Sequence, residues 1–159
     1  MRFILYIFLI ASTLMAQQVD KTVPLDAWKT LSYVNAAKNA DELPNALLTL
    51  NHASYVGLHN TPKVNYISVP TNEGGTVSYG GMFQIHIQAS GTYRVALANT
   101  SWIDMIQNAK VAKSIAHQGG PKGSGIKKMV DYKLEAGEYT LQLSAGADST
   151  TALMIVKLD

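Results

Sequence analysis

Alternation of apolar and polar residues dominates the chain from Ala46 onward, and it constrains the fold more than any other feature. Gly, Pro or Asn interrupts the alternation about every eight to twelve residues. Alternation places one face of each strand in the core, and the turn residues reverse the chain. We therefore predict an all-β domain over residues 46–159, built as an antiparallel β-sandwich of jelly-roll type.

Eight segments have the length and composition of short strands. They are 47–50, 64–69, 82–88, 93–98, 102–107, 127–134, 139–143 and 152–158. The alternation also predicts which side chains face the core, and it predicts a hairpin through Gly146 between the last two segments. The expected inward-facing residues are Phe83, Ile85, Ile87, Tyr139, Leu141, Leu143, Met154, Val156 and Leu158.

Two segments, 89–97 and 135–143, share a small residue, a Gly turn and a Tyr that enters an alternating strand. Gly permits the tight backbone. The hydroxyl of Tyr93 or Tyr139 can then bond back to the turn while the ring is buried, as in the tyrosine corner of sandwich folds. We interpret the repeat as one corner used twice, with duplicated halves as the alternative.

The register around Asn99 and Thr100 is less well determined. A two-residue turn there pairs Leu97 with Trp102 and places Asp104 on the core-facing side, whereas a shift of one residue places Arg94 there. Arg94 and Asp104 are mutual partners only if the register permits, and a longer loop is the alternative.

The first residues predict export. Arg2 precedes an uncharged apolar run that is shorter than the roughly 20 residues of a membrane span, and Ala16 offers a cleavage point. We assign 1–16 as a signal peptide, with an uncleaved anchor as the alternative, and 17–45 as an irregular or short-helical segment. Leu25, Trp28 and Leu31 have helical spacing within it.

Composition fits an exported protein that is periplasmic or secreted. The chain has no cysteine, so packing and strand pairing must stabilise it without disulfides. A net charge of +2 gives no indication of nucleic-acid binding. No later stretch is apolar for long enough to form a stable membrane span after cleavage of the leader.

The loop 114–128 is the strongest candidate for a binding site. It is rich in Gly, and five lysines without an acid lie between Lys110 and Lys128. Bare backbone can approach a ligand closely, and lysines favour an anion. The loop lacks the Gly-Lys-Ser/Thr ending of a phosphate-binding loop. A solvated connection between sheets is the alternative. The residues that we predict to bind a ligand are Arg94, Trp102, Asp104, His117, Lys122, Ser124, Lys127 and Lys128.

Metal and catalytic signals are weak. None of His52, His59, His86 and His117 is paired at a spacing that makes a local metal site. His117, beside the Gly-rich loop, is the best single ligand for a copper or iron ion, and His86 is expected on the surface. Ser124 does not lie in a nucleophile motif. We expect no cofactor, with a metal ion as the alternative.

Several segments in order, including 75–83, 91–97, 124–132 and 137–142, resemble a group of small exported proteins often labelled homogentisate 1,2-dioxygenase. The resemblance covers most of residues 46–158. It implies ferrous iron held by two His and one carboxylate. This chain has Gly119 where the group often has a second His, and no Cys at or next to Gly123. These departures weaken a metal or disulfide role at those positions. Because the chain has a predicted export leader, a short domain and no pair of His at metal-binding spacing, we do not expect the ring-opening activity.

The residues favour a non-catalytic periplasmic sandwich that binds an unidentified ligand or an envelope protein through the loop 114–128. A metal-binding protein or metal-dependent enzyme that uses His117 is the first alternative. A structural subunit of an envelope complex is the second.

Overall fold

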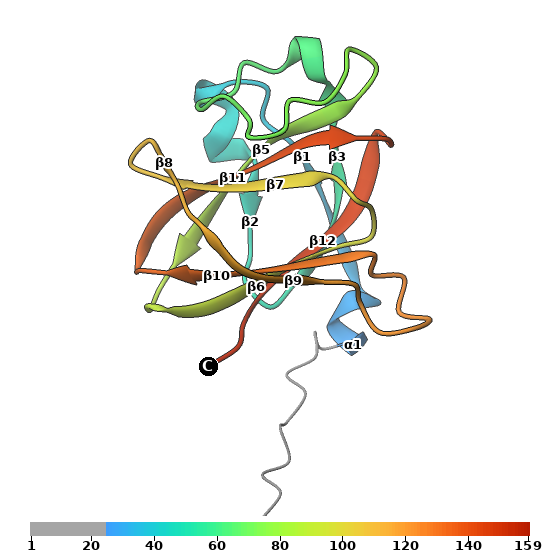
Figure 1. The fold of residues 1–159 in the computed structure, drawn as a ribbon, viewed down its shortest axis with the longest axis vertical. Helices are drawn as coiled ribbons and strands as arrows, with labels where there is room; N and C mark the ends of the chain where they lie inside the picture. Colours follow the sequence, from blue (N-terminus) through green and yellow to red (C-terminus); the bar gives the residue numbers. More distant parts are fainter. Residues whose placement is uncertain (1–24) are drawn as a thin grey trace, which may run out of the picture.

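A computed structural model describes residues 25–159, so the predicted signal peptide lies outside the described part of the chain. Two six-stranded sheets pack against each other as a β-sandwich, which confirms the predicted fold class (Figure 1). β1 is parallel to β3 and β2 is parallel to β5, and the other pairs are antiparallel. None of the helices in residues 25–159 is long and apolar enough to cross a membrane.

The first sheet has the order β1-β3-β12-β6-β10-β9, and the second has β2-β5-β11-β7-β8 with β4 paired to β5. The strands of the first sheet are β1 (Leu31–Asn35), β3 (Ala53–Gly57), β6 (Gly91–Leu97), β9 (Ser114–Gln118), β10 (Lys128–Leu134) and β12 (Thr150–Lys157). Those of the second are β2 (Leu47–Leu48), β4 (His59–Asn60), β5 (Tyr79–Ile87), β7 (Trp102–Gln107), β8 (Lys110–Val111) and β11 (Gly137–Gly146). The helices are α1 (Leu25–Trp28) and the 3-10 turns η1 (Ala40–Asn45) and η2 (Thr61–Lys63).

The main core lies between the sheets, and alternation explains most of it. Phe83, Ile85 and Ile87 of β5 are buried there as predicted, together with Tyr139, Leu141 and Leu143 of β11. Both predicted tyrosine corners are confirmed. The buried Tyr93 donates its hydroxyl proton to the carbonyl of Ala89 at 2.6 Å, and the Tyr139 hydroxyl accepts the backbone N–H of Glu135 at 3.1 Å.

Of the two alternatives left open around Asn99 and Thr100, the two-residue turn does not form, and a longer connection takes its place. β6 lies between β12 and β10 in the first sheet, whereas β7 lies between β11 and β8 in the second. Leu97 therefore pairs with Lys128 and Leu153 instead of Trp102. Residues 98–101 carry the chain from one sheet to the other. Alternation cannot separate a hairpin from such a crossover, because both bury the same face of each strand.

The predicted hairpin through Gly146 is wrong for the same reason, since β11 and β12 belong to different sheets. The inward residues of β12 are Leu153 and Ile155. Met154 and Val156 are buried on the outer face of the first sheet, in a second cluster against which Leu158 and Trp28 of α1 pack. Both faces of β12 are apolar, so its sequence alone does not fix which one faces the main core.

Several other segments differ from the prediction, and they include the unpredicted strands β3, β4 and β8. Leu31 begins β1, an edge strand that was not predicted, while α1 matches the short helix expected around Leu25. Residues 64–69 form no strand. They belong to a long loop held on the second sheet by side chains of β11. Gln142 bonds the backbone of Ser68 in both directions, at 3.2 and 3.0 Å.

The β7–β8 turn offers a test of backbone strain. Asn108 and Ala109 have φ of 50° and 60°, as a two-residue turn of this twist requires. A left-handed conformation costs a non-Gly residue about 1–2 kcal/mol, and Gly at an exposed site loses about 0.5–1 kcal/mol through chain entropy. Ala109→Gly is therefore expected to raise the free energy of unfolding by about 1 kcal/mol in urea denaturation. Ala147→Gly, at an exposed residue without positive φ, should lower it. Equal effects of the two changes would contradict the explanation.

Candidate functional site

A cavity of about 480 Å³ opens between the two sheets, where β7 of the second sheet faces β9 and β10 of the first. This volume lies within the range of small-molecule sites. The residues that line it come from β7 and the crossover before it, from β9 and the residue after it, and from β10 and the residue before it. They are Thr100, Trp102, Ile103, Ser114, His117, Gln118, Gly119, Lys127, Lys128, Val130 and Tyr132.

The floor of the cavity is the edge of the main core. Ile103, Val130 and Tyr132 are buried members of that core. The Tyr132 hydroxyl donates to the carbonyl of Ile103 at 3.1 Å, and burial raises the pKa of this phenol well above its ordinary value. The phenol is therefore neutral, and the floor presents an apolar, uncharged surface.

Lys128 brings a cation into this apolar setting. Its Nζ lies 5.0 Å from the centroid of the Trp102 ring and donates to the carbonyl of Ser101 at 2.9 Å. Burial lowers the pKa of Lys128, and the nearby charge of Asp104 offsets this only in part. Within residues 25–159, no salt bridge joins Lys128 to a carboxylate. The ammonium is thus partly desolvated and lacks a bonded counter-charge.

Asp104 fixes the position of the Trp102 ring through a hydrogen bond to the indole N–H. The indole Nε1 donates to Asp104 Oδ1 at 3.1 Å and also to the Thr71 hydroxyl. Asp104 in turn accepts the backbone N–H of Thr71 at 2.9 Å and its hydroxyl proton at 2.5 Å. Asp104 is buried and does not line the cavity. The structure therefore makes it a positioning residue that fixes the ring and the loop carrying Thr71.

Arg94 lies away from the cavity, and the register does not permit the pairing with Asp104 that was considered for it. Its guanidinium bonds Asp131 twice, at 2.7 and 2.8 Å, and only 8% of Arg94 and 7% of Asp131 is exposed. The two residues are cross-strand neighbours on β6 and β10. They share the outer face of the first sheet with Val156, the cross-strand neighbour of Arg94 on β12. The crossover at 98–101 put β7, and with it Asp104, in the other sheet.

The segment predicted as a loop over 114–128 divides into two parts. Residues 114–118 form the edge strand β9, and only 119–127 form a loop. Ser124 stabilises that loop, since its hydroxyl donates to Pro121 O at 2.7 Å and accepts the N–H of Ile126 at 3.2 Å. Gly123 and Gly125 adopt φ of 79° and 77°, a backbone conformation that residues with a side chain rarely adopt. Lys122 is exposed on the loop and does not line the cavity.

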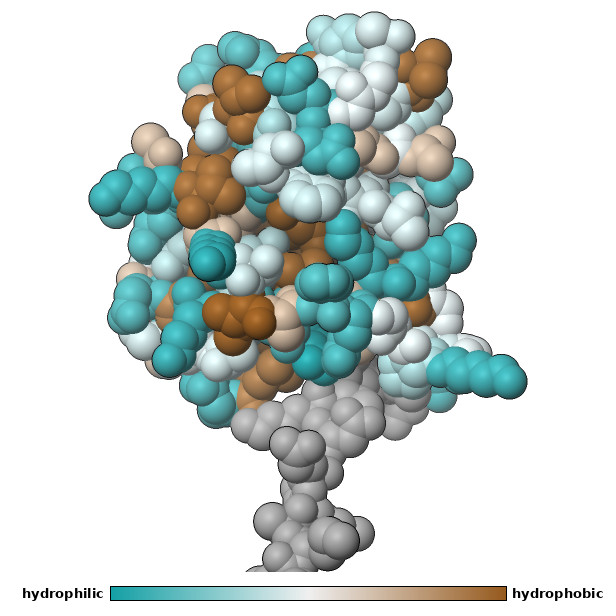
Figure 2. Space-filling view, in the orientation of Figure 1, coloured by the Kyte–Doolittle hydropathy of each residue, from teal (hydrophilic) through white to brown (hydrophobic). Residues whose placement is uncertain are grey.

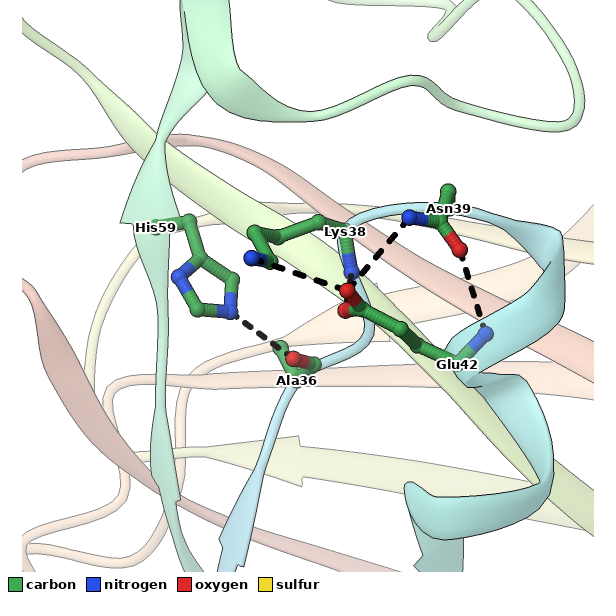
Figure 3. A network of polar contacts seen from close by, with 5 residues as sticks. All are labelled: Ala36, Lys38, Asn39, Glu42 and His59. Carbon is green, nitrogen blue, oxygen red and sulfur yellow. Dashed lines mark hydrogen bonds and ion pairs between the residues drawn. The ribbon is translucent and has the colours of Figure 1, made fainter.

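The four histidines lie in separate places. His117 lines the cavity, and His52 is exposed. His86 lies on the surface as predicted, and it bonds Glu138 there. His59 donates from Nε2 to the carbonyl of Ala36 at 2.8 Å, a contact that Figure 3 draws as a dashed line. Among residues 25–159, no three His, Cys, Asp or Glu side chains gather as a metal site would require.

The network in Figure 3 is built around Glu42 of η1, which lies beside β5 of the second sheet. Glu42 accepts the backbone N–H of Lys38 at 2.8 Å and pairs with its ammonium at 3.5 Å. The backbone hydrogen bond lowers the pKa of this carboxyl group, with a smaller contribution from the Lys38 charge. Asn39 caps the start of η1 by accepting the N–H of Glu42. These contacts orient η1. The polar groups bond to each other, so they do not form a metal or ligand site.

The structure thus brings together Trp102, His117, Lys127 and Lys128, and it places Arg94, Asp104, Lys122 and Ser124 elsewhere. Sequence reasoning missed the apolar floor at Ile103 and Val130, because these residues read only as core positions of alternating strands. Their position next to Trp102 and Lys128 was the available signal. The chain matches no protein-family model and no curated protein.

Proposed function

We propose that this protein is a non-catalytic binding protein of the cell envelope, and that its cavity takes an anionic ligand with an apolar body. One observation carries the proposal. The ammonium of Lys128 is partly buried over the Trp102 ring, inside a cavity, without a carboxylate bonded to it in the described part of the chain. A partly desolvated charge of this kind gains free energy when a ligand brings the opposite charge.

The charge of the lining supports an anion. Lys127 and Lys128 contribute two positive charges, and the lining residues include no Asp or Glu. The nearest acid, Asp104, already accepts bonds from Thr71 and Trp102. A ligand carboxylate or phosphate would therefore meet cations and hydrogen-bond donors at the mouth of the cavity.

The floor of the cavity supports an apolar body. Ile103 and Val130 offer aliphatic surface, and the Trp102 ring is held rigid by its indole bonds. Burial of apolar ligand surface is worth about 25 cal/mol per Å², so a chain of a few methylene groups against this floor adds measurably to the affinity. The envelope location rests on the leader at 1–16.

A matched set of amphiphiles tests the proposal. Octanoate, octanol and octylamine share a chain and differ in head charge, whereas acetate has the charge without the chain. We expect octanoate to raise the midpoint of thermal unfolding and to change the emission of Trp102 in a Trp28→Phe background. Octanol, octylamine and acetate should do neither at the same concentration. Octylamine binding as tightly as octanoate would contradict the proposal.

A further inference from the structure

The two edge strands next to the cavity carry an unusual combination of exposed side chains. Lys110 and Val111 of β8, Lys113 after it and Ile115 of β9 are all exposed, with 40% of Val111 and 55% of Ile115 accessible to solvent. We call these four residues the basic edge. Figure 2 shows hydrophobic side chains among hydrophilic ones on the face of the molecule drawn there.

The charge of this region is not balanced locally. Between Asp104 and Asp131 the chain has five lysines and no acid. Both flanking aspartates are buried and bonded, Asp104 to Thr71 and Trp102, and Asp131 to Arg94. Lys122 and Lys127, which follow β9, are exposed as well. The basic edge therefore presents a positive surface that suits an anionic partner.

The structure of β9 argues against strand addition as the mode of binding. Asp131 pairs with Ala116 and Tyr132 with Ser114, so Ile115 is an extra residue in a bulge. Bulges and edge lysines are the devices by which proteins prevent another strand from pairing with a sheet edge. The bulge and the edge lysines therefore disfavour strand pairing at the exposed Ile115, and a contact with a surface is the alternative mode of binding.

We propose that the basic edge docks on the surface of an anionic lipid bilayer. Lys110 and Lys113 lie at the head groups, and Val111 and Ile115 enter the interfacial layer. Lysines near an anionic surface and apolar side chains beside them act together in peripheral binding, because neither alone holds a protein on a membrane. This goes beyond the binding of a ligand in the cavity, since none of the four residues lines it.

Cosedimentation with vesicles tests the docking, using the processed protein isolated from its compartment. We expect binding to vesicles that contain phosphatidylglycerol, little binding to vesicles of phosphatidylcholine alone, and release at high salt. Each lysine near the surface contributes about 1 kcal/mol, about fivefold in affinity, so Lys110→Gln with Lys113→Gln should weaken binding about 25-fold. Ile115→Ser should weaken it several-fold at every salt concentration.

Lys63→Gln with Lys157→Gln is the matched control, because it removes the same charge from η2 and from the end of β12. This variant should bind vesicles within about twofold of the wild type, given that surface attraction decays within a Debye length. Equal loss in the two double variants, or equal binding to neutral vesicles, would overturn the proposal. Binding to poly-glutamate instead of vesicles would overturn it in favour of an acidic protein partner. The Lys110/Lys113 variant should still bind octanoate, which separates this inference from the proposed function.

Discussion

Replacing Arg94 by Met is expected to lower the free energy of unfolding by about 3–5 kcal/mol, the largest effect on stability that we predict for a single residue. The change leaves the carboxylate of Asp131 buried, with 7% exposure, and without the two hydrogen bonds that Arg94 donates to it. A buried charge that loses its partner pays its full desolvation cost. Urea denaturation followed by circular dichroism measures the loss.

The double variant Arg94→Met with Asp131→Leu is the control. It removes both charges and fills the space with apolar groups next to the second cluster, which contains Met129 and Val156. Buried ion pairs are often replaced in this way with little loss, so the double variant should recover most of the stability. If Arg94→Met alone costs less than about 1 kcal/mol, the pair is solvated and the explanation is wrong.

The same pair shows what the sequence could and could not predict. Alternation places Arg94 on the face of β6 opposite Tyr93, Val95 and Leu97, and a charge that is buried there needs a partner. It does not say which strand lies beside β6, because strand order depends on contacts between distant segments. The nearest acid along the chain after Arg94 is Asp104, but the crossover at 98–101 moves it to the other sheet, and Asp131 on β10 becomes the neighbour.

Structural features that depend on adjacent residues were predicted more reliably than features that depend on distant ones. The tyrosine corners at Tyr93 and Tyr139 depend on a few adjacent residues, and both are present. The loop over 64–78 depends on partners about 70 residues away, since Ser144 of β11 donates to the carbonyl of Asn72 at 2.6 Å. Polar side chains on the outer face of β11 read as solvent-facing, yet Gln142 and Ser144 are buried beneath this loop.

The candidate site was predicted in part for a related reason. Trp102 and Lys128 are unusual residues at strand starts, and sequence reasoning selected both. Their contact across the sandwich depends on how β7 and β10 face each other, which no local pattern encodes. Once β7 and β10 face each other, the alternation of side chains along each strand gives the apolar floor. Ile103 and Val130 then point into the core beside Trp102 and Lys128.

Replacing Lys128 by Met is expected to weaken octanoate binding about 10- to 150-fold, which corresponds to the roughly 1.5–3 kcal/mol of a charge-assisted hydrogen bond. Met keeps most of the side-chain stem against the Trp102 ring and removes the ammonium. The free energy of unfolding should change by about 1 kcal/mol or less, because the lost contacts with Trp102 and Ser101 are offset by the relief of a desolvated charge. Calorimetric titration measures the affinity, and urea denaturation measures the stability.

The pH dependence gives a second readout for Lys128. Burial lowers the pKa of this ammonium below its ordinary value of 10.5, whereas a bound anion favours the protonated form and raises it again. The site therefore takes up protons on binding when the pH exceeds the lowered pKa. Octanoate affinity should fall as the pH rises through that value, starting below 10.5, and this fall should be reduced in Lys128→Met.

Lys122→Met is the matched control, since it removes an exposed lysine from the loop beside the cavity without touching the lining. If the net charge of the region were enough to attract the anion, Lys122→Met and Lys128→Met would weaken binding equally, and both effects would vanish at high salt. If contact inside the cavity determines affinity, only Lys128→Met weakens binding strongly, and the loss persists in salt because a partly buried pair is poorly screened. The second result is expected, because the Lys128 ammonium is held over Trp102 at the cavity wall, where a ligand displaces the remaining water.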